Sequence, residues 1–294
     1  MLFSALRIAL VSYIGAAALL YVFQSRVMYH PPGPNTVTPD ALGLRYEDVR
    51  LTTSDGVNLG AWFVPAASPR GVLLYCHGNG DNLSRTLEWV ELYHRMGLSV
   101  LTFDYRGYGD SEGQPTEQGT YLDAQSAWDY LVQQRGVPPE QIIVAGKSLG
   151  GAVATHLARD HTPRALILES TFTSLPDLAA DMLWFLPTRY LARYDYRSIE
   201  KLPQVRCPVL IMHSPDDRLI PFSHGRRLYE AAGQPKQFIE MDGGHNAGPE
   251  GSGRKYAEGI RDFITNQTGM PQKLETRDSE SQTSTSSPAN APSP

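Results

Sequence analysis

The chain has 294 residues, of which 41% are hydrophobic, and a formal net charge of −5. This length and hydrophobic content suffice for one large α/β domain, and a second domain is not required. This net charge gives no basic footprint of the kind expected for nucleic-acid binding, and it does not favour acidic substrates. Cys76 and Cys207 each lie beside an apolar run typical of a buried strand, so neither a disulfide nor a metal role is expected.

The first segment, Leu2 to Phe23, is almost continuously apolar and about long enough to cross a bilayer. A cleavable signal peptide is the alternative, because Arg7 lies near the amino terminus, but no convincing small-residue cleavage site follows the apolar stretch. We therefore predict a single-pass transmembrane anchor over residues 1–26, with Tyr29 among the residues suited to the membrane interface. Pro31 to Pro34 cannot continue a helix, so residues 27–45 are interpreted as an extended linker.

A folded domain is predicted over residues 46–267. Two strand-like runs, Tyr46–Thr52 and Val57–Val64, flank a Ser-Asp-Gly turn and should form an antiparallel pair. Further strands are expected at Gly71–Cys76, Ser99–Phe103, Gln141–Ala145, Ala165–Glu169, Val209–His213 and Gln237–Met241. Helical segments are expected at Leu83–Met96, Thr116–Arg135, Gly151–Arg159, Phe222–Ala232 and Tyr256–Asn266. This alternation predicts a mostly parallel sheet covered by helices on both faces.

The alternation fails between residues 171 and 203, where aromatic residues are dense and Pro176 and Pro187 interrupt the chain. We interpret this stretch as an inserted cap, in which Trp184, Phe185 and Leu186 would line an apolar pocket. An ordinary packing helix is the alternative. Residues 268–294 are rich in Ser, Thr, Pro and charge, so a disordered tail is expected there.

A serine at a sharp turn marks one strand-to-helix junction. Ser148 follows the strand Gln141–Ala145 and precedes a helix, with Gly146 and Gly150 placed where a strained turn needs small residues. The helix start offers free N–H groups and a partial positive charge, which suit the oxyanion that forms when a serine attacks an acyl carbon. Ser148 is therefore the candidate nucleophile; a structural Gly/Ser turn is the alternative.

The same five-residue pattern occurs a second time, at Gly109 to Gly113 around Ser111. There a glycine-rich stretch separates the pattern from the preceding apolar run, and Pro115 follows in place of helical periodicity. We interpret the second occurrence as a loop.

A serine nucleophile needs a histidine base and a carboxylate that orients it. Functional groups collect beyond the C-terminal ends of parallel strands, and three such ends supply candidates. Asp216 and Asp217 follow Val209–His213, and His245 follows Gln237–Met241. Glu169, at the end of another strand, is an alternative acid, whereas His77 is interpreted as structural.

The serine, acid and histidine occur in the order used by α/β-hydrolases, and the chain resembles that superfamily from about Tyr46 to Asn266. The resemblance is to its membrane-anchored branch, related to serine aminopeptidases, monoacylglycerol lipases and depalmitoylases. It rests on the motifs His77-Gly78-Asn79-Gly80, Phe103 to Gly109, Gly146 to Gly150, Asp217 to Pro221 and Gly244-His245. It implies Ser148 as nucleophile, Asp217 as acid and His245 as base, with the backbone N–H groups of Asn79 and Leu149 forming the oxyanion hole. Ser214 departs from the glycine that the family usually has there.

These expectations describe a membrane-tethered serine hydrolase that forms an acyl-enzyme at Ser148 and needs no metal or cofactor. A carboxylic ester or thioester of a small-molecule or lipid-like acyl group is the expected substrate. A peptidase and a non-catalytic scaffold are the alternatives. We expect the catalytic domain on the extracytoplasmic side of the membrane; the oligomeric state is not predicted.

Overall fold

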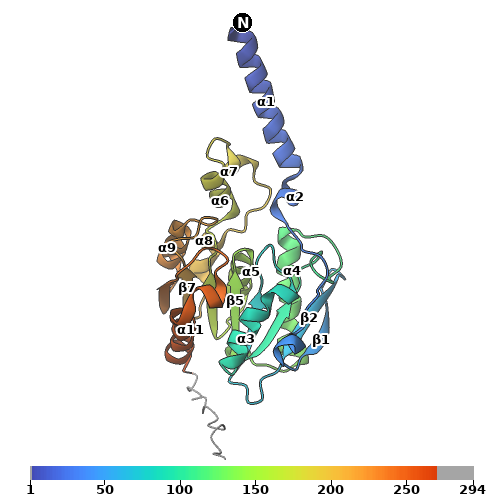
Figure 1. The fold of residues 1–294 in the computed structure, drawn as a ribbon, viewed down its shortest axis with the longest axis vertical. Helices are drawn as coiled ribbons and strands as arrows, with labels where there is room; N and C mark the ends of the chain where they lie inside the picture. The colour runs from blue at the N-terminus through green and yellow to red at the C-terminus, as the bar shows by residue number, and fades with distance from the viewer. Residues whose placement is uncertain (1, 270–294) are drawn as a thin grey trace, which may run out of the picture.

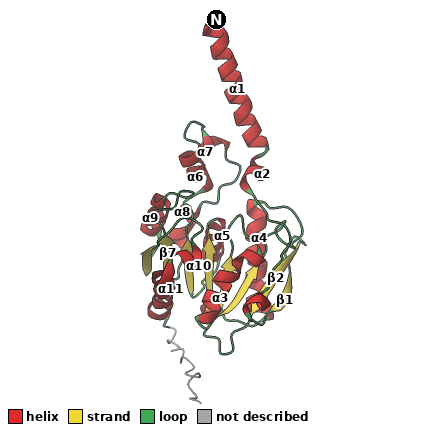
Figure 2. Ribbon diagram, in the orientation of Figure 1, coloured by secondary structure: helices red, strands yellow, loops and turns green. Residues whose placement is uncertain are grey.

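The predicted strands form one eight-stranded sheet in a computed structural model that describes residues 2–269 (Figures 1 and 2). The strands are β1 Glu47–Thr52, β2 Asn58–Val64, β3 Val72–Cys76, β4 Ser99–Phe103, β5 Ile142–Lys147, β6 Ala165–Glu169, β7 Val209–His213 and β8 Lys236–Glu240. Their order is β1-β2-β4-β3-β5-β6-β7-β8. β1 and β2 form the expected antiparallel pair, β2 is antiparallel to β4, and every later pairing is parallel. The predicted α/β-hydrolase fold with a mostly parallel sheet is confirmed.

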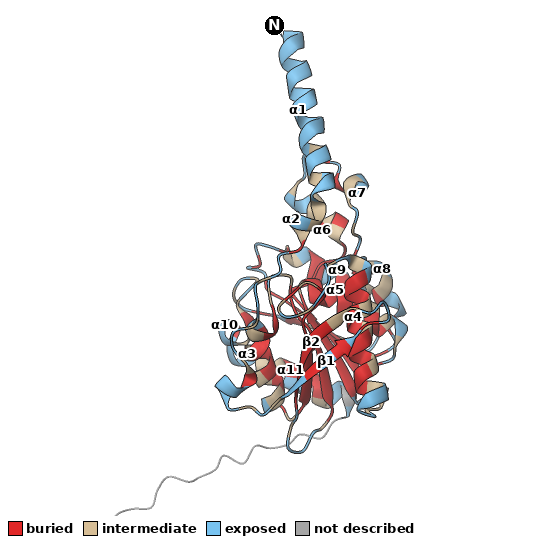
Figure 3. Ribbon diagram, turned by 90° about the vertical axis from the view of Figure 1, so that its right-hand side faces the viewer, coloured by how far each residue is buried: buried red, intermediate tan, exposed pale blue. Residues whose placement is uncertain are grey.

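Helices cover both faces of this sheet, so its central strands are buried throughout (Figure 3). One face carries α4 Glu117–Asp129, α5 Leu149–Asp160, α8 Ser198–Lys201 and α9 Phe222–Ala231. The other carries α3 Leu87–Arg95, which follows the 3-10 turn η2 Leu83–Thr86, and α11 Gly253–Thr268. Successive side chains of β3 divide between the two core clusters, Leu74 with the first and Leu73 with the second, as the period of two along a strand requires.

Shorter elements complete the domain. The 3-10 turns η1 Pro39–Leu42 and η4 Pro139–Gln141 precede β1 and β5, and one π-helical turn, η3 Tyr130–Gln134, extends α4. The 3-10 turn η5 Leu202–Gln204 leads to β7, and α10 Gly248–Gly251 precedes α11. The predicted disordered tail lies, from residue 270 onward, outside the described residues.

The segment predicted as a cap lies between β6 and β7 and contains α6 Leu175–Met182, α7 Thr188–Leu191 and α8. Its ends are joined, because the backbone N–H of Leu175 donates to the carbonyl of Asp195 at 2.9 Å. Of the three residues expected to line a pocket, only Leu186 is buried. Trp184 and Phe185 lie on the surface, which contradicts their predicted place in an apolar pocket.

The apolar N-terminal segment forms α1 Leu2–Val22, followed by the short α2 Gln24–Met28. Helix α1 projects from the domain with no buried residue (Figures 1 and 3), and it is long and apolar enough to cross a membrane. A signal sequence meets the same criteria.

Tyr29 contradicts its predicted place at the membrane interface. It is 4% exposed, and its hydroxyl lies 2.8 Å from the hydroxyl of Tyr196. Thr120 Oγ1 lies 2.9 Å from the same Tyr196 oxygen, so a buried chain of three hydroxyls joins the C-terminal end of α2 to α4. The beginning of the segment predicted as a linker is therefore packed into the domain.

Candidate active site

The turn between β5 and α5 holds Ser148 in a strained conformation. Ser148 has φ 53° and ψ −118°, a region that residues with a Cβ rarely adopt. A Cβ on Gly146 would lie 2.2 Å from the carbonyl oxygen of Gly150, and one on Gly150 would lie 2.0 Å from the carbonyl oxygen of Cys76. Both glycines are therefore required, because strand and helix approach too closely for any side chain.

The end of β6 and the residues after it hold the turn in place. The N–H of Ser148 donates to the carbonyl of Glu169 at 2.9 Å, and the hydroxyl of Thr171 donates to the carbonyl of Ser148 at 2.7 Å. Ser148 itself is partly exposed. Leu149 is the first residue of α5, so its N–H has no acceptor within the helix and can serve a group beside Ser148.

The loops after β7 and β8 bring the predicted acid and base together. Nδ1 of His245 lies 2.7 Å from Oδ2 of Asp217. In the tautomer that this contact favours, Nδ1–H donates to the carboxylate and Nε2 is left with a lone pair that can accept a proton. Asp216 is exposed and makes no such contact, so of the two neighbouring aspartates only Asp217 meets His245.

The carboxylate of Asp217 is fixed and kept ionised by its surroundings. Its Oδ1 accepts from the N–H groups of Leu219 at 2.9 Å and Ile220 at 2.8 Å. Burial alone would raise its pKa, but hydrogen bonds from His213, His245 and the backbone of Ile220 outweigh burial and lower the pKa well below its usual range. His213, which its sequence position indicated only as the residue that ends a strand, lies 3.4 Å from Oδ2 and is a member of this site.

Ser214, the departure from the family pattern, joins two loops of the site. Its hydroxyl donates to the carbonyl of Gly243, just before His245, and accepts from the N–H of Asp216 at 3.0 Å. A glycine could make neither contact. The substitution therefore ties the acid loop to the histidine loop, and it leaves the Asp217 turn intact.

Asn79, in the loop after β3, is held by its side chain. Its Oδ1 accepts from the hydroxyl of Tyr108 at 2.6 Å, and its Nδ2 donates to the carbonyl of Met28 at 2.5 Å. The N–H of His30 also donates to Oδ1, at 3.3 Å. The loop that carries the second predicted oxyanion donor is thus attached to the foot of α2, a contact that no sequence pattern indicated.

The remaining candidates have structural partners. Oε2 of Glu169 accepts from Nε1 of Trp89 at 2.9 Å and from the hydroxyl of Tyr256 at 2.6 Å, so its observed contacts are to core side chains and not to a histidine. His77 is fully buried against Tyr105, with 4.4 Å between ring centroids. Ser111 lies in a loop, as predicted, where its hydroxyl donates to the carbonyl of Asp104 at 2.8 Å.

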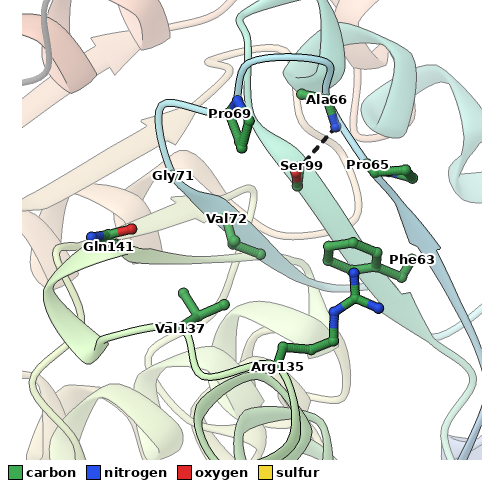
Figure 4. A pocket seen from close by; sticks show the side chains of 10 residues that line it. All are labelled: Phe63, Pro65, Ala66, Pro69, Gly71, Val72, Ser99, Arg135, Val137 and Gln141. Carbon is green, nitrogen blue, oxygen red and sulfur yellow. Dashed lines mark hydrogen bonds between the residues drawn. The ribbon is translucent and has the colours of Figure 1, made fainter.

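A separate surface pocket lies at the opposite edge of the sheet (Figure 4). Val72 and Ser99, in its wall, begin β3 and β4, whereas Ser148 lies beyond the C-terminal end of β5. The Arg135 guanidinium, 4.0 Å from the ring centroid of Phe63, forms another part of the wall. This pocket has no contact with the Asp217–His245 pair. Among residues 2–269 no cluster of three or more His, Cys, Asp or Glu side chains could hold a metal ion.

Comparisons with known proteins identify the family. Residues 67–199 match the family model described as serine aminopeptidase, S33. An uncharacterized protein of Mycobacterium tuberculosis is 37% identical over 268 residues, which are 88% of this chain and 94% of that protein. The lysophosphatidylserine lipase ABHD12 of Danio rerio is 34% identical over 227 residues, which are 64% of this chain and 59% of the lipase.

Solved structures share the fold at lower identity. The Pyrococcus furiosus esterase Pf2001 superposes with a TM-score of 0.69 over 82% of this chain and 100% of the esterase, at 19% identity. The sheet, the turn at Ser148 and the relatives all lead to one assignment: the chain belongs to the α/β-hydrolase superfamily, within the serine aminopeptidase S33-like family.

Proposed function

We propose that this protein is a membrane-anchored serine hydrolase that cleaves carboxylic ester or thioester bonds, with Ser148 as nucleophile, His245 as base and Asp217 as acid. The observation that carries the proposal is the 2.7 Å contact between His245 Nδ1 and Asp217 Oδ2, in a fold that presents Ser148 at a strained turn. This contact leaves Nε2 of His245 as the proton acceptor that a serine hydroxyl needs.

In the proposed reaction, the hydroxyl of Ser148 attacks the acyl carbon while His245 takes its proton. The N–H groups of Leu149 and Asn79 stabilise the oxyanion, helped by the N-terminus of α5. His245 then protonates the leaving alcohol or thiol, and an acyl-enzyme remains on Ser148. Water, deprotonated by His245, attacks the acyl-enzyme and releases the acid. The ionised carboxylate of Asp217 stabilises the imidazolium that forms in both halves of the reaction.

Ester chemistry is favoured by the relative named a lysophosphatidylserine lipase and by the structural neighbour named an esterase. Aminopeptidase activity is the second candidate, because the matching family model carries that description. The purified full-length protein in detergent should hydrolyse short acyl esters faster than aminoacyl amides, and a series of acyl chain lengths would define the substrate. Faster cleavage of the amides would replace the esterase proposal with a peptidase. A folded protein that neither cleaves any of these substrates nor reacts with a fluorophosphonate would be a scaffold.

We also propose that α1 anchors the protein, with its catalytic domain on the extracytoplasmic side. Full-length protein should stay in the membrane after carbonate extraction, and protease protection would report the side. Release by carbonate, or a mature protein lacking α1, would contradict the anchor. Protection patterns that place the domain in the cytoplasm would reverse the orientation.

A truncated protein beginning at Gln24 should be soluble, because it keeps Met28 and Tyr29 in their contacts with the domain. One that begins at Pro31 loses both residues, and its free energy of unfolding should fall by about 3 kcal/mol, as for other large buried side chains. Equal stability of the two truncated proteins would show that the buried Tyr29 contributes little.

A further inference from the structure

The cap exposes a cluster of large apolar side chains on α6, α7 and the loop between them. These are Met182, Trp184, Phe185 and Tyr190. Trp184 is 83% exposed, and its ring contacts that of Phe185 edge to face, with 5.9 Å between centroids. Single exposed apolar side chains are normal on a protein surface, whereas a cluster of large ones marks an interaction site.

This cap tip, defined here as residues 182–190, is attached to the side of α1. The hydroxyl of Tyr13 donates to the carbonyl of Phe185 at 3.0 Å. Tyr13 precedes the last residue of α1, Val22, by two and a half turns, or roughly 14 Å along the helix axis. Even allowing for the length of the tyrosine side chain, the carbonyl of Phe185 lies beside α1 and not beyond its end. Figures 1 and 3 both place α7 near the last turns of this helix.

The end of α1 has the composition of a membrane–water interface. The Arg193 guanidinium lies 5.6 Å from the ring centroid of Tyr21, and the Arg26 guanidinium lies 5.7 Å from that of Phe23. Gln24 connects this level to the cap, because its Nε2 donates to the carbonyl of Leu191 and its Oε1 accepts from the N–H of Arg193. Aromatic rings with arginines are typical of the headgroup level, where the cations also attract anionic lipids.

The contact between the cap tip and α1 indicates that lipid covers the exposed cluster. The helix that the cap tip touches is itself unburied and apolar along its length. A bilayer that holds α1, with Tyr21 and Arg193 at the headgroups, must surround the level of Tyr13 and therefore the cap tip. A partner protein at this surface would have to displace lipid from α1 and from the cap tip.

We propose that the cap tip inserts into the leaflet that contains the C-terminal half of α1, and that acyl substrates reach Ser148 from this leaflet instead of from solution. Insertion rests on the proposed anchoring by α1, and the access step rests in addition on the proposed hydrolase function. The end of α2 and the start of the cap both adjoin the site, because Asn79 is hydrogen-bonded to Met28 and Thr171 is hydrogen-bonded to Ser148. The proposed substrate is therefore a lipid ester that stays in the bilayer while its carbonyl enters the site.

Trp184 provides a direct test of insertion. The chain has four tryptophans, and the other three, Trp62, Trp89 and Trp128, are at most 6% exposed. Full-length protein, with α1 retained, would be reconstituted into vesicles of phosphatidylcholine and phosphatidylglycerol containing lipid brominated at acyl carbons 6 and 7. The emission of Trp184 is the part of the tryptophan fluorescence that the Trp184→Phe variant lacks. Quenching of this emission by the brominated lipid would support insertion. Quenching of that emission by aqueous iodide but not by brominated lipid would overturn it.

A second experiment tests access. The double variant Trp184→Glu, Tyr190→Glu should lower turnover of a long-chain ester carried in the same vesicles about tenfold, while hydrolysis of a water-soluble acetyl ester stays within about twofold, since two charges oppose insertion. Leu42→Glu, which removes an exposed apolar side chain outside the cap, should change neither rate. Equal losses for both esters would overturn the access route. Quenched Trp184 in a protein that cleaves no ester would instead contradict the proposed function and leave insertion standing.

Discussion

Two regions of this molecule share one sequence pattern and have different structures. In Gly146 to Gly150 the serine takes positive φ, 53°, and lies between a buried strand and a helix. In Gly109 to Gly113 the glycines take it instead, with φ 48° and 84°, and the serine lies in a loop. The hydroxyl of Ser111 has a donor and an acceptor, Gly60 N–H at 3.0 Å and the carbonyl of Asp104 at 2.8 Å. For the hydroxyl of Ser148 no hydrogen bond is found within residues 2–269. The same pattern thus gives a serine at a strained strand-to-helix turn in one place and a hydrogen-bonded loop serine in the other, depending on which residue has the positive φ.

The largest expected difference between the two serines is in activity. Ser148→Ala should lower kcat by about 10⁴ or more and abolish fluorophosphonate labelling, because the nucleophile is lost. Ser111→Ala should leave labelling near normal. His245→Ala should cost about as much as Ser148→Ala, and the double variant little more, since residues that act as one unit are non-additive. Labelling that survives Ser148→Ala and vanishes in Ser111→Ala would reverse the assignment of the two motifs.

The next effect tests which carboxylate serves Ser148. Asp217→Asn should lower kcat by about 10³ to 10⁴, because a neutral amide neither holds the His245 imidazole in the required tautomer nor stabilises the imidazolium that forms. Asp216→Asn, one residue away and exposed, is the matched control and should be much milder. Glu169→Gln should act on stability through Trp89 and Tyr256. Full activity in Asp217→Asn with loss in Glu169→Gln would move the acid to the end of β6.

Gly150 and Gly113 should both be required for stability, but for different physical reasons. Gly150→Ala places a Cβ 2.0 Å from the backbone oxygen of Cys76, and backbone cannot rotate away, so we expect a loss of about 3–5 kcal/mol in the free energy of unfolding or failure to fold. At Gly113 the nearest atom is 3.3 Å away, in the side chain of Val57, and the cost comes from φ +84°, about 1–2 kcal/mol. Urea denaturation measures both. A Gly150→Ala protein within 1 kcal/mol of wild type would show that strand and helix can separate there.

Stability should reverse the ranking of the two serines. Ser111→Ala leaves the N–H of Gly60 and the carbonyl of Asp104 without their hydroxyl partner, which should cost about 1–2 kcal/mol. Ser148→Ala removes no observed hydrogen bond of the hydroxyl and should stay within about 0.5 kcal/mol of wild type. A marked destabilisation by Ser148→Ala would indicate that the hydroxyl has a structural role at the turn between β5 and α5.

The elements that the sequence predicted well are those whose constraints are local. Strand bounds agree to within one or two residues, because each strand is a short apolar run between turns, and the turn at Ser148 is marked by its own glycines. The pairing of Asp217 with His245 followed from strand ends meeting at one edge of the sheet; the catalytic roles stay predictions. The sequence missed the burial of Tyr29 and the exposure of Trp184. Tyr29 meets a partner 167 residues away, in a segment without periodicity, so no local pattern could reveal it.

The smallest expected effect is on the pH dependence of stability, and it distinguishes Asp217, in the site of Ser148, from Asp104, beside Ser111. Hydrogen bonds lower the pKa of Asp217, whereas burial raises the pKa of Asp104, which adjoins Ser111. A lowered pKa stabilises the fold above the usual aspartate range, and this contribution is lost as the pH falls. Asp217→Asn should therefore lose less stability than wild type between pH 6 and pH 3, by about 1 kcal/mol.

A raised pKa acts in the opposite sense, because the folded state then binds the extra proton and is favoured as the pH falls. Asp104→Asn lacks this contribution, so acidification should destabilise it more than wild type. Its amide oxygen can still accept from the N–H of Leu83, which preserves the local geometry. Chemical denaturation at several pH values measures both slopes. If the two variants shifted the pH dependence in the same direction, the carboxylates would share one kind of environment, and the contrast between the motifs would be confined to the backbone.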